Sequence, residues 1–464
     1  MDKYKKLINN SIIFAIGNLG SKFLQFILVP LYSFTLSTAD FGTADFLTQL
    51  VYLLTPIVSL ELYDAVFRYA LDKNEDKFVL FNTVSTVLLV VSLIAFLVSP
   101  IFANIFDDYH VYSTVIFLIA NICFAFLSNF VRAIGYVREF AIAGIVNTFF
   151  MGIFSVIFLV VFKLGLVGYL MSFSIGLVAG CIYIVLSTHI SRFIGINNFN
   201  KLKLFEMLKY SLPLIPNYFA WWLNSTSDRL FIITMISASA NGIYAMATKI
   251  PNLINLLTMV FSQSWQISIV EEYKKKNSRK FVSNVFTSFF SILIISGILI
   301  IVSIKPIYWL FLDKSYYNGW RLTPLLVLAV IYSGLALLLE GVYTAYKKTF
   351  SVLVTTIWGA IINIVLTIIL IPIIGIYGAA LANVISFLIV TIMRMFEIRR
   401  LGLLVIDIKR ILIYHLAFFI VTFIALKEES TFMVIGVGVI MVFLLIIFDR
   451  NIIHQLRIIL NKKK

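Results

Sequence analysis

Long runs of apolar residues alternate with short polar breaks along the whole chain. The breaks include DKNEDK (72–77), FDDYH (106–110), EEYKKKNSRK (271–280) and DKSYYNGW (313–320). A helix needs about 20 apolar residues to cross a bilayer, and most of the runs reach that length. The pattern therefore predicts an all-α polytopic membrane protein with about 14 transmembrane helices. The predicted spans are 11–36, 43–67, 79–103, 111–131, 139–162, 166–187, 207–234, 242–267, 281–304, 321–345, 350–372, 376–396, 410–426 and 431–448.

Composition agrees with this pattern and excludes several classes of protein. Hydrophobic residues make up 61% of the 464 positions, and charged residues make up 13%, about half the share usual in soluble domains. The chain carries no Gly-rich phosphate loop and no His/Cys set with metal-ligand spacing. We therefore expect no enzyme activity, no cofactor and no metal site. Cys123 and Cys181 lie inside predicted spans, where we expect them to act as small apolar side chains.

The net charge of +15 reflects the predicted membrane topology. With the N-terminus in the cytoplasm, only five of the 37 Lys and Arg residues fall in external loops and three fall inside spans. An excess of Lys and Arg marks cytoplasmic segments, so both termini are predicted to be cytoplasmic. The positive balance also favours contact with anionic inner-leaflet lipid. A nucleic-acid partner is not expected.

Two parts of the chain resemble each other at fixed offsets. At a shift of 200, Ser37 aligns with Ser237 and Gly42 with Gly242; at a shift of 210, KLGLVGYL (163–170) aligns with IIGIYGAA (373–380). Chance identity among apolar sequences is the alternative. The repeat predicts two six-helix lobes in parallel orientation, an arrangement typical of transporters. The expected domains are 1–204, 205–400, and 401–464 with two additional helices and a basic cytoplasmic tail.

The first predicted span carries a polar face. Asn18, Lys22 and Gln25 fall within roughly 60° of one another at 100° per residue, and Lys22 lies near the middle of the span. A charge at mid-bilayer costs about 2.5–3.5 kcal/mol, so such groups face protein or water. Lys22 is therefore predicted to line a cavity between the lobes, or to pair with a carboxylate that holds two helices together.

The seventh predicted span carries a second polar face that includes Asn224 and Asp228. Arg229 points about 100° away from Asp228 on a helix, which predicts that the two do not face the same point. One would line the cavity while the other pairs with a neighbouring helix. The alternative is a structural ion pair near the outer surface.

Two further clusters stand at the ends of spans. In the eighth span, Lys249 precedes Pro251, which can break backbone hydrogen bonding; Lys249 is either a site residue or structural. At the end of the second span, Glu61, Asp64 and Arg68 share a face, and Asp64 can pair with Arg68 at i,i+4. An ordinary solvated helix end is the alternative there.

The cations inside spans come from both predicted lobes. Lys22, Arg229 and Lys249 would make a cationic cavity, which suits an anionic cargo such as a phosphate or pyrophosphate.

Carboxylates nearby could carry a coupling proton or sodium ion. The candidates are Asp228, Asp45 and Glu340. Asp45 lies early in the second span, where an interfacial cap is the favoured alternative. Glu340 lies close to the predicted cytoplasmic end of the tenth span, where a structural role is favoured.

Four segments resemble a known family: GNLGSKFLQFILVPLYSFTLSTADFGTADF (17–46), LYDAVFRYALD (62–72), YSLPLIPNYFAWWLNSTSDRLFI (210–232) and GIYAMATKIPNLI (242–254). They are similar to the Wzx-type polysaccharide repeat-unit flippases of the multidrug/oligosaccharidyl-lipid/polysaccharide exporter superfamily. The resemblance extends over about residues 1–400. It implies two six-helix bundles in a V around a central cavity, plus two C-terminal helices.

The resemblance also implies a function. The cargo would be an undecaprenyl-pyrophosphate-linked oligosaccharide, moved from the inner to the outer leaflet of the bacterial cytoplasmic membrane and coupled to an inward cation gradient. Lys22, Arg229 and Lys249 would attract the pyrophosphate or anionic sugars, and Asp228 would pair or take part in coupling. Partners would include a polymerase and a chain-length regulator. Because one chain contains both lobes, a monomer is expected.

Three other functions remain open at this point. A drug/cation antiporter of the same superfamily would favour an acidic, aromatic cavity. A flippase for the peptidoglycan precursor would be essential for growth. A membrane scaffold in a polysaccharide assembly complex would not need buried cations in both lobes.

Overall fold

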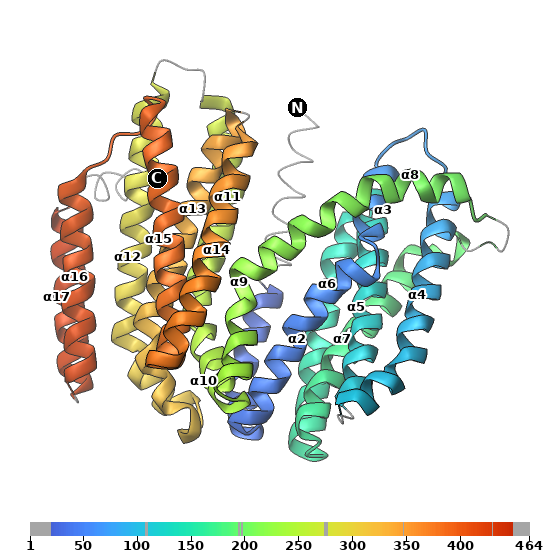
Figure 1. Cartoon of the computed structure of the whole chain (residues 1–464), viewed down its shortest axis with the longest axis horizontal. Helices are drawn as coiled ribbons and strands as arrows, with labels where there is room; N and C mark the ends of the chain where they lie inside the picture. The colour runs from blue at the N-terminus through green and yellow to red at the C-terminus, as the bar shows by residue number, and fades with distance from the viewer. Residues whose placement is uncertain are drawn as a thin grey trace, which may run out of the picture. The chain divides into compact units, whose positions relative to one another are not determined.

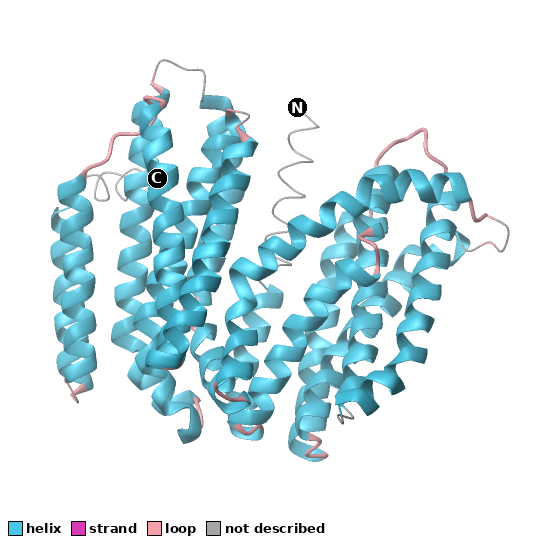
Figure 2. Cartoon of the chain, viewed as in Figure 1, coloured by secondary structure: helices cyan, strands magenta, loops and turns pink. Residues whose placement is uncertain are grey.

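The computed structural model describes residues 20–106, 110–193, 195, 198–272, 277–346, 348–428 and 430–448. All regular secondary structure within these ranges is helical, as Figure 1 and Figure 2 show. The predicted all-α class is therefore confirmed. The predicted V around a central cavity stays a prediction.

The chain divides into two compact units, Met1–Thr226 and Ser227–Lys464, and the boundary falls inside α9. The predicted domain boundaries at 204 and 400 stay predictions. Unit 1 begins with a helix described over residues 20–35. Its other helices are α2 (Thr38–Val58), α3 (Leu62–Ala70), α4 (Lys77–Phe106), α5 (His110–Ala133), α6 (Val137–Val156), the π-helix η1 (Ile157–Val161), α7 (Gly165–Thr188), the 3-10 helix η2 (Ile190–Phe193), α8 (Lys201–Ser211), the 3-10 helix η3 (Leu212–Leu214) and the start of α9 (Ile215–Met235).

Unit 2 contains the end of α9 and all helices that follow it. A continuous apolar core joins residues of α11, α12, α13, α15, α16 and α17. These helices bury large side chains such as Phe290, Tyr343 and Phe418. The helices of unit 2 after α9 are α10 (Ala238–Lys249), α11 (Asn252–Glu272), α12 (Ser278–Phe311), the 3-10 helix η4 (Lys314–Leu322), α13 (Thr323–Ala345), α14 (Thr349–Ile374), α15 (Ile376–Arg400), α16 (Ile408–Lys427) and α17 (Thr431–Phe448).

Eleven helices in the described ranges are long and apolar enough to cross a membrane. Eleven of the about 14 predicted spans are thus confirmed as helices of sufficient length and apolar character. The remaining three fall short for different reasons. The span 11–36 begins outside the described residues, α9 carries too many polar side chains over its length, and the described apolar part of α17 covers only Thr431–Ile447.

The positions that repeat in the sequence have the same local structure in both units. The Ser37 hydroxyl caps α2 by accepting from the Asp40 backbone N at 3.0 Å, and Ser237 caps α10 by accepting from Ala240 N at 3.1 Å. A serine oxygen that accepts from the first turn stabilises a helix start. The turns before α7 and α15 both hold a glycine with positive φ, Gly165 at 55° and Gly375 at 60°, which a side chain would strain.

The predicted second span, 43–67, is broken rather than continuous. After α2 ends at Val58, Leu60 and Glu61 both adopt a left-handed backbone with φ of 54°, and α3 begins at Leu62. The Glu61 backbone N donates to the Pro56 carbonyl at 2.9 Å, a bond from residue i+5 to i that is typical of helix ends. No glycine marks this break in the sequence, so the apolar pattern alone predicts an uninterrupted helix.

Candidate functional site

A cluster of polar side chains surrounds Asp228 inside unit 2. We call it the polar cluster, and it comprises Asp228, Arg229, Tyr244, Asn363 and Asn383 from α9, α10, α14 and α15. The Asp228 side chain is buried, with 3% of its surface exposed. Its Oδ2 accepts from the Tyr244 hydroxyl at 2.5 Å and from Asn383 Nδ2 at 3.0 Å. Its Oδ1 accepts from the Arg229 backbone N at 2.9 Å and from Arg229 Nη1 at 3.2 Å.

The two asparagines extend the cluster to a second pair of helices. Asn363 Nδ2 donates to Asn383 Oδ1 at 2.7 Å, and Asn383 Nδ2 also donates to the Tyr244 hydroxyl at 2.9 Å. Asn363 is buried with 1% exposure. A buried carboxylate is tolerated only when donors replace its lost hydration. The polar cluster supplies four such donors from three helices, so the charge of Asp228 is stabilised there.

The prediction that Asp228 and Arg229 do not face the same point is wrong. Their Cβ atoms do diverge by about 100° around α9, but the arginine side chain is long enough to bring its guanidinium back to the neighbouring carboxylate. Arg229 is 8% exposed, and its Nη2 lies 3.5 Å from the Thr248 hydroxyl. Leaving a buried charge unpaired costs far more free energy than bending the arginine side chain back toward its neighbour. The ion pair therefore forms between adjacent residues.

Sequence reasoning missed three members of this cluster, Tyr244, Asn363 and Asn383. The signal was available for the two asparagines, because each is a lone amide in a long apolar run. Tyr244 gave no such signal, since a tyrosine in an apolar helix packs well without a special role. Only the packing of α10 and α15 against α9 reveals what its hydroxyl contacts.

The other predicted cationic site residues lie in different places. Lys22 and Gln25 are exposed on the helix 20–35 of unit 1. Lys249 is half-buried at the last residue of α10, directly before the break at Pro251 that the sequence predicts. Asn18 lies outside the described residues, and so does the side chain of Asn224.

The second predicted cluster of unit 1 differs from its prediction. Asp64 accepts from the Tyr218 hydroxyl at 2.9 Å, and within the described part of the chain no ion pair joins it to Arg68. Arg68 is exposed on α3. The predicted Asp64–Arg68 pair is therefore wrong, because the start of α9 brings a tyrosine to the carboxylate first.

Glu61 lies inside the break between α2 and α3 and is completely buried, with 0% exposure. Neither of its carboxyl oxygens has a hydrogen-bond partner among the described residues. The Tyr63 and Tyr218 hydroxyls and the Asp64 carboxyl nevertheless lie close to it, so its surroundings are polar although no hydrogen bond is well formed. The alternative of a solvated helix end is thus wrong for Glu61. A buried acid whose oxygens accept no well-formed hydrogen bond is rare in folded proteins, which makes Glu61 a candidate functional group.

Asp45 is a second buried carboxylate of unit 1, with 2% exposure. It was expected to cap its helix at the membrane interface, and this is wrong. Ser37 caps α2 and Asp40 supplies the acid of the first turn, whereas Asp45 stands two turns further in. Tyr52 and Tyr169 lie close enough for the charge of Asp45 to act on their hydroxyl groups.

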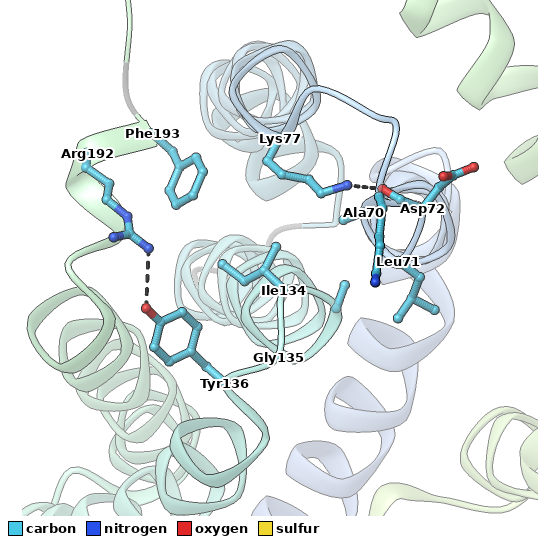
Figure 3. A pocket seen from close by; sticks show the side chains of 11 residues that line it. Ala70, Leu71, Asp72, Lys77, Ile134, Gly135, Tyr136, Arg192 and Phe193 are labelled. Carbon is cyan, nitrogen blue, oxygen red and sulfur yellow. Dashed lines mark hydrogen bonds between the residues drawn. The ribbon is translucent and has the colours of Figure 1, made fainter. Parts of the chain in front are cut away.

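A basic pocket of about 560 Å³ lies within unit 1, where the end of α3, the start of α4, the α5–α6 turn and η2 come together (Figure 3). Lys77 Nζ donates to the Asp72 backbone carbonyl, and Arg192 Nη2 donates to the Tyr136 hydroxyl at 3.3 Å. The residues that line the basic pocket are Ala70, Leu71, Asp72, Lys73, Lys77, Ala133, Ile134, Gly135, Tyr136, Arg192 and Phe193.

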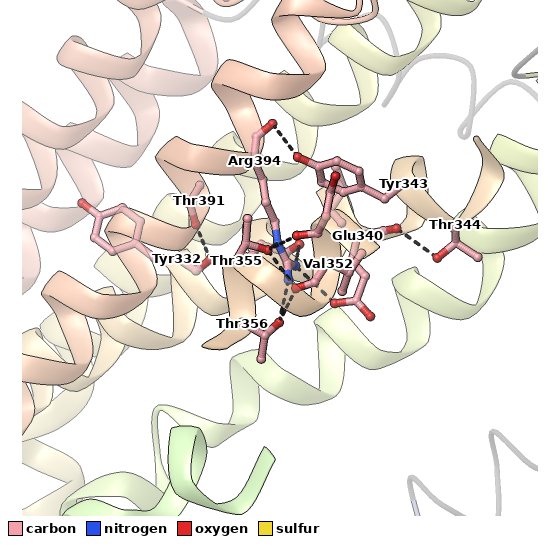
Figure 4. A network of polar contacts seen from close by, with 12 residues as sticks. Tyr332, Glu340, Tyr343, Thr344, Val352, Thr355, Thr356, Thr391 and Arg394 are labelled. Atoms are coloured by element: carbon pink, nitrogen blue, oxygen red, sulfur yellow. Dashed lines mark hydrogen bonds and ion pairs between the residues drawn. The ribbon is translucent and has the colours of Figure 1, made fainter. Parts of the chain in front are cut away.

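The third coupling candidate, Glu340, belongs to a network centred on a buried arginine (Figure 4). Arg394 of α15 is 3% exposed. Its Nη1 lies 3.2 Å from Glu340 Oε2 and 2.7 Å from the Ala336 carbonyl of α13, and its Nε and Nη2 donate to the Thr355 and Thr356 hydroxyls of α14 at 3.0 and 3.1 Å. This geometry supports the structural alternative for Glu340, because its charge is used to hold three helices together.

Among the residues that the structure describes, no group of three His, Cys, Asp or Glu side chains could hold a metal ion. The polar cluster offers a single carboxylate, so it is suited to a proton or a monovalent cation rather than to a divalent metal.

The chain is similar in sequence to a known family and to a known membrane protein. Residues 7–267, more than half of the chain, match the family model described as "Polysaccharide biosynthesis protein". An uncharacterized membrane protein of Methanocaldococcus jannaschii is 21% identical over 421 residues, covering 85% of this chain and 98% of the relative.

Two solved structures are similar in fold. A structure of the lipid II flippase MurJ in an inward closed conformation superimposes with a TM-score of 0.70 at 16% identity, covering 95% of this chain and 100% of that one. An inward-facing multidrug resistance MATE family transporter of the MOP superfamily gives a TM-score of 0.66 at 12% identity, covering 82% and 94%. At these identities the likeness shows the fold alone.

Proposed function

Because the chain belongs to the polysaccharide biosynthesis protein family, a family of membrane transporters and not of enzymes, we propose that it is a lipid-linked oligosaccharide flippase. Its cargo would be an undecaprenyl-pyrophosphate-linked repeat unit, moved from the cytoplasmic to the outer leaflet for assembly of a surface polysaccharide. The family match over residues 7–267 is the observation that carries this proposal. The similarity in fold to MurJ supports it, because that protein is a lipid II flippase.

The cargo site follows from the cations inside the helices. The ion pair with Asp228 compensates the charge of Arg229, which reduces its value for binding a pyrophosphate. The proposal for anion binding therefore places more weight on Lys22, which is exposed on the helix 20–35, and on Lys249 at the end of α10. Arg229 is instead assigned to pairing with Asp228.

Coupling to a cation gradient is proposed to act through the polar cluster. Asp228 joins α9 to α10 and α15 through side-chain hydrogen bonds. If a proton or sodium ion binds to this carboxylate, its bonds to Arg229 Nη1 and Asn383 Nδ2 must rearrange. A local charge change would then alter how the three helices pack, which is the kind of event that drives alternating access.

The test of the cargo uses cells that lack this gene. We expect the lipid-linked repeat unit to accumulate on the cytoplasmic leaflet and the surface polymer to be lost. Plasmid-borne wild type and Lys209→Ala, which removes an exposed lysine of α8, should restore the polymer. Lys22→Ala and Lys249→Ala should reach the membrane at normal levels and restore less than about a tenth of it.

Two other outcomes would replace this proposal. Normal polymer with raised sensitivity to cationic drugs would indicate a drug/cation antiporter. Loss of viability with accumulation of the peptidoglycan precursor would indicate a flippase for that lipid instead.

The test of coupling uses purified protein in liposomes with an imposed proton or sodium gradient. Asp228→Asn should abolish the response of lipid transfer to the gradient, whereas Glu340→Gln should keep it because Glu340 acts within the Arg394 network. An unchanged response in Asp228→Asn would remove Asp228 from the coupling mechanism and leave the cargo proposal intact.

A further inference from the structure

We propose that the basic pocket of unit 1 binds the phosphate headgroup of an anionic phospholipid from the cytoplasmic leaflet. The pocket shares no residue with the polar cluster or with the proposed cargo site. The inference does not depend on the proposed function, since it concerns a resident lipid and not the cargo.

Cations outnumber acids in the lining of the pocket, and Glu75 of the same α3–α4 connection pairs with Lys203 instead. Lys73, Lys77 and Arg192 line it against a single carboxylate, that of Asp72. Within the described part of the chain, none of the three cations forms an ion pair: Lys77 bonds a backbone carbonyl and Arg192 bonds a neutral hydroxyl. The Asp72 carboxylate itself accepts from the Asn74 backbone N at 3.0 Å. Two lysines and an arginine fork around one cavity match the acceptor oxygens of a phosphate ester.

The pocket is held in place by the elements around it. The aromatic ring of Phe193, at its wall, packs against Phe130 and Phe78, with ring centroids 5.3 and 4.8 Å apart. Gly135 turns the chain between α5 and α6 with φ of 103°, a conformation that a residue with a side chain rarely adopts. Phe193 therefore fixes the position of Arg192, and the Gly135 turn fixes that of Tyr136.

Half of the lining is apolar, which favours a lipid over a free phosphate. Leu71 lines the pocket and is 52% exposed, and α4 begins at the pocket with Lys77. Only 17% of the most apolar part of α4 is buried within the protein. Its exposed residues Leu89, Leu93, Leu97 and Ile101 follow one another at intervals of four, so they form one apolar face along which an acyl chain can lie.

The position relative to the membrane also fits. The distribution of Lys and Arg assigns the α3–α4 connection, the α5–α6 turn and η2 to the cytoplasmic side. Basic pockets between transmembrane helices on that side bind anionic headgroups of the inner leaflet. The occupant is therefore inferred to be an anionic phospholipid, of which phosphatidylglycerol is the simplest representative.

Native mass spectrometry of the full-length protein in detergent tests this proposal. The protein is titrated with phosphatidylglycerol and with phosphatidylcholine of the same acyl chains. The test variant combines Lys73→Gln, Lys77→Gln and Arg192→Gln. The matched control combines Arg138→Gln, Lys201→Gln and Lys209→Gln, which removes three charges from the same unit and the same predicted side but outside the pocket.

We expect the wild type to bind phosphatidylglycerol in preference to phosphatidylcholine. The test variant should lose one bound lipid per chain, with affinity lower by on the order of 100-fold, while the control keeps it. A second basic cavity of about 620 Å³ in unit 2, lined by Arg279, Lys280 and Arg410, explains why other lipids can stay bound. If the triple variant does not fold, Lys73→Gln alone, at an exposed position, should lower the affinity several-fold.

Three results would overturn the inference. If the test variant and the control lose the same lipid affinity, the loss is caused by the change in net charge and not by the pocket. Displacement of the lipid by millimolar inorganic phosphate would make the site a free-anion site. Preference for farnesyl pyrophosphate over phosphatidylglycerol would make the pocket a docking site for the cargo. All of these readouts are made without transport, so a failure here leaves the proposed function untouched.

Discussion

Asp228 and Arg229 are adjacent in the chain and form an ion pair that is almost fully buried. The pair matters because each charge is stable only in the presence of the other. The Coulomb attraction in a low-dielectric interior offsets much of the cost of desolvating two ions, and removal of one partner leaves the other uncompensated. The donors Tyr244 and Asn383 support the carboxylate but cannot balance the charge of the guanidinium.

We predict that Asp228→Ala lowers the stability of the purified protein by about 3–5 kcal/mol. The double variant Asp228→Ala/Arg229→Met should recover most of this loss, because no buried charge then remains unpaired. The measurement is the free energy of unfolding in detergent from denaturant titrations of the wild type, both single variants and the double variant. A double variant as unstable as Asp228→Ala would show that the ion pair does not account for the loss.

Glu61 presents the opposite situation, a buried acid that has no ion pair in the described part of the chain and whose carboxyl oxygens accept no well-formed hydrogen bond, although the Tyr63 and Tyr218 hydroxyls lie nearby. Such a group costs stability, so its presence in a packed break is explained best by a task in the transport cycle. Glu61→Gln keeps the shape of the side chain and removes the ionisable group. We expect its melting temperature to equal or exceed that of the wild type, and its restoration of surface polymer in deletion cells to fall.

The control for this prediction is Glu139→Gln in the first turn of α6. Glu139 is only half-buried, and its substitution should change the stability by less than about 0.5 kcal/mol. A clear fall in melting temperature for Glu61→Gln would mean that the carboxylate is compensated in the folded protein. Full polymer restoration by Glu61→Gln would assign Glu61 no part in transport.

At the scale of elements, the guanidinium of Arg394 joins α15 to both α13 and α14 (Figure 4). The same region holds a second connection, since Glu397 of α15 accepts from the Tyr343 hydroxyl of α13 at 3.0 Å and from the Ser351 hydroxyl of α14 at 2.8 Å. Between apolar helices in a membrane, packing and hydrogen bonds replace the hydrophobic driving force. These side chains therefore keep the three helices together as one body.

We predict that Arg394→Lys lowers the stability by about 2–3 kcal/mol although it keeps the charge. An ammonium is a point donor and cannot reach Glu340, Thr355 and Thr356 in one geometry, as the planar fork does. Thermal unfolding in detergent measures the effect. Arg399→Lys, at an exposed position of the same helix, should change nothing measurable. Equal melting temperatures for the two variants would assign Arg394 no role in joining the helices.

The elements themselves were largely predictable, and the exceptions are physical. Every predicted span has a helical counterpart in the described ranges, because a hydrophobic run of sufficient length is a local signal. The breaks were less visible. Pro251 indicates the break before α11 in the sequence. The left-handed residues Leu60 and Glu61 give no such signal, because neither is a residue type that prefers that conformation.

For the whole molecule, the orientation in the membrane is the property that the other proposals depend on. The Lys and Arg distribution predicts this orientation, with segments such as 72–77 on the cytoplasmic side and the η4 region outside. The basic pocket needs this orientation to face the cytoplasmic leaflet, and the proposed cargo must enter from the same side.

We predict that Lys314→Cys, in η4, is labelled by a membrane-impermeant maleimide in intact cells. Asn74→Cys, in the turn between α3 and α4, should be labelled only after the membrane is permeabilised. Both substitutions are placed in a chain with Cys123→Ala and Cys181→Ala, and labelling is followed by a mass shift on gels. The reverse pattern would invert the topology and, with it, the leaflet assigned to the basic pocket.

The sequence by itself determined the helical class, the positions of the spans, the repeat of Ser37 and Gly165 at Ser237 and Gly375, and the family resemblance. These depend on residues near one another in the chain, or on periodic composition. The tertiary structure decided which polar groups meet. Asp228 contacts Asn383 across 155 positions, and the basic pocket brings Lys73 and Lys77 together with Arg192, which follows them by more than 100 positions. Glu61 became a buried acid only when other helices covered it. Such contacts arise from the packing of helices that are distant in sequence. The local pattern of apolar and polar residues therefore does not predict which side chains meet.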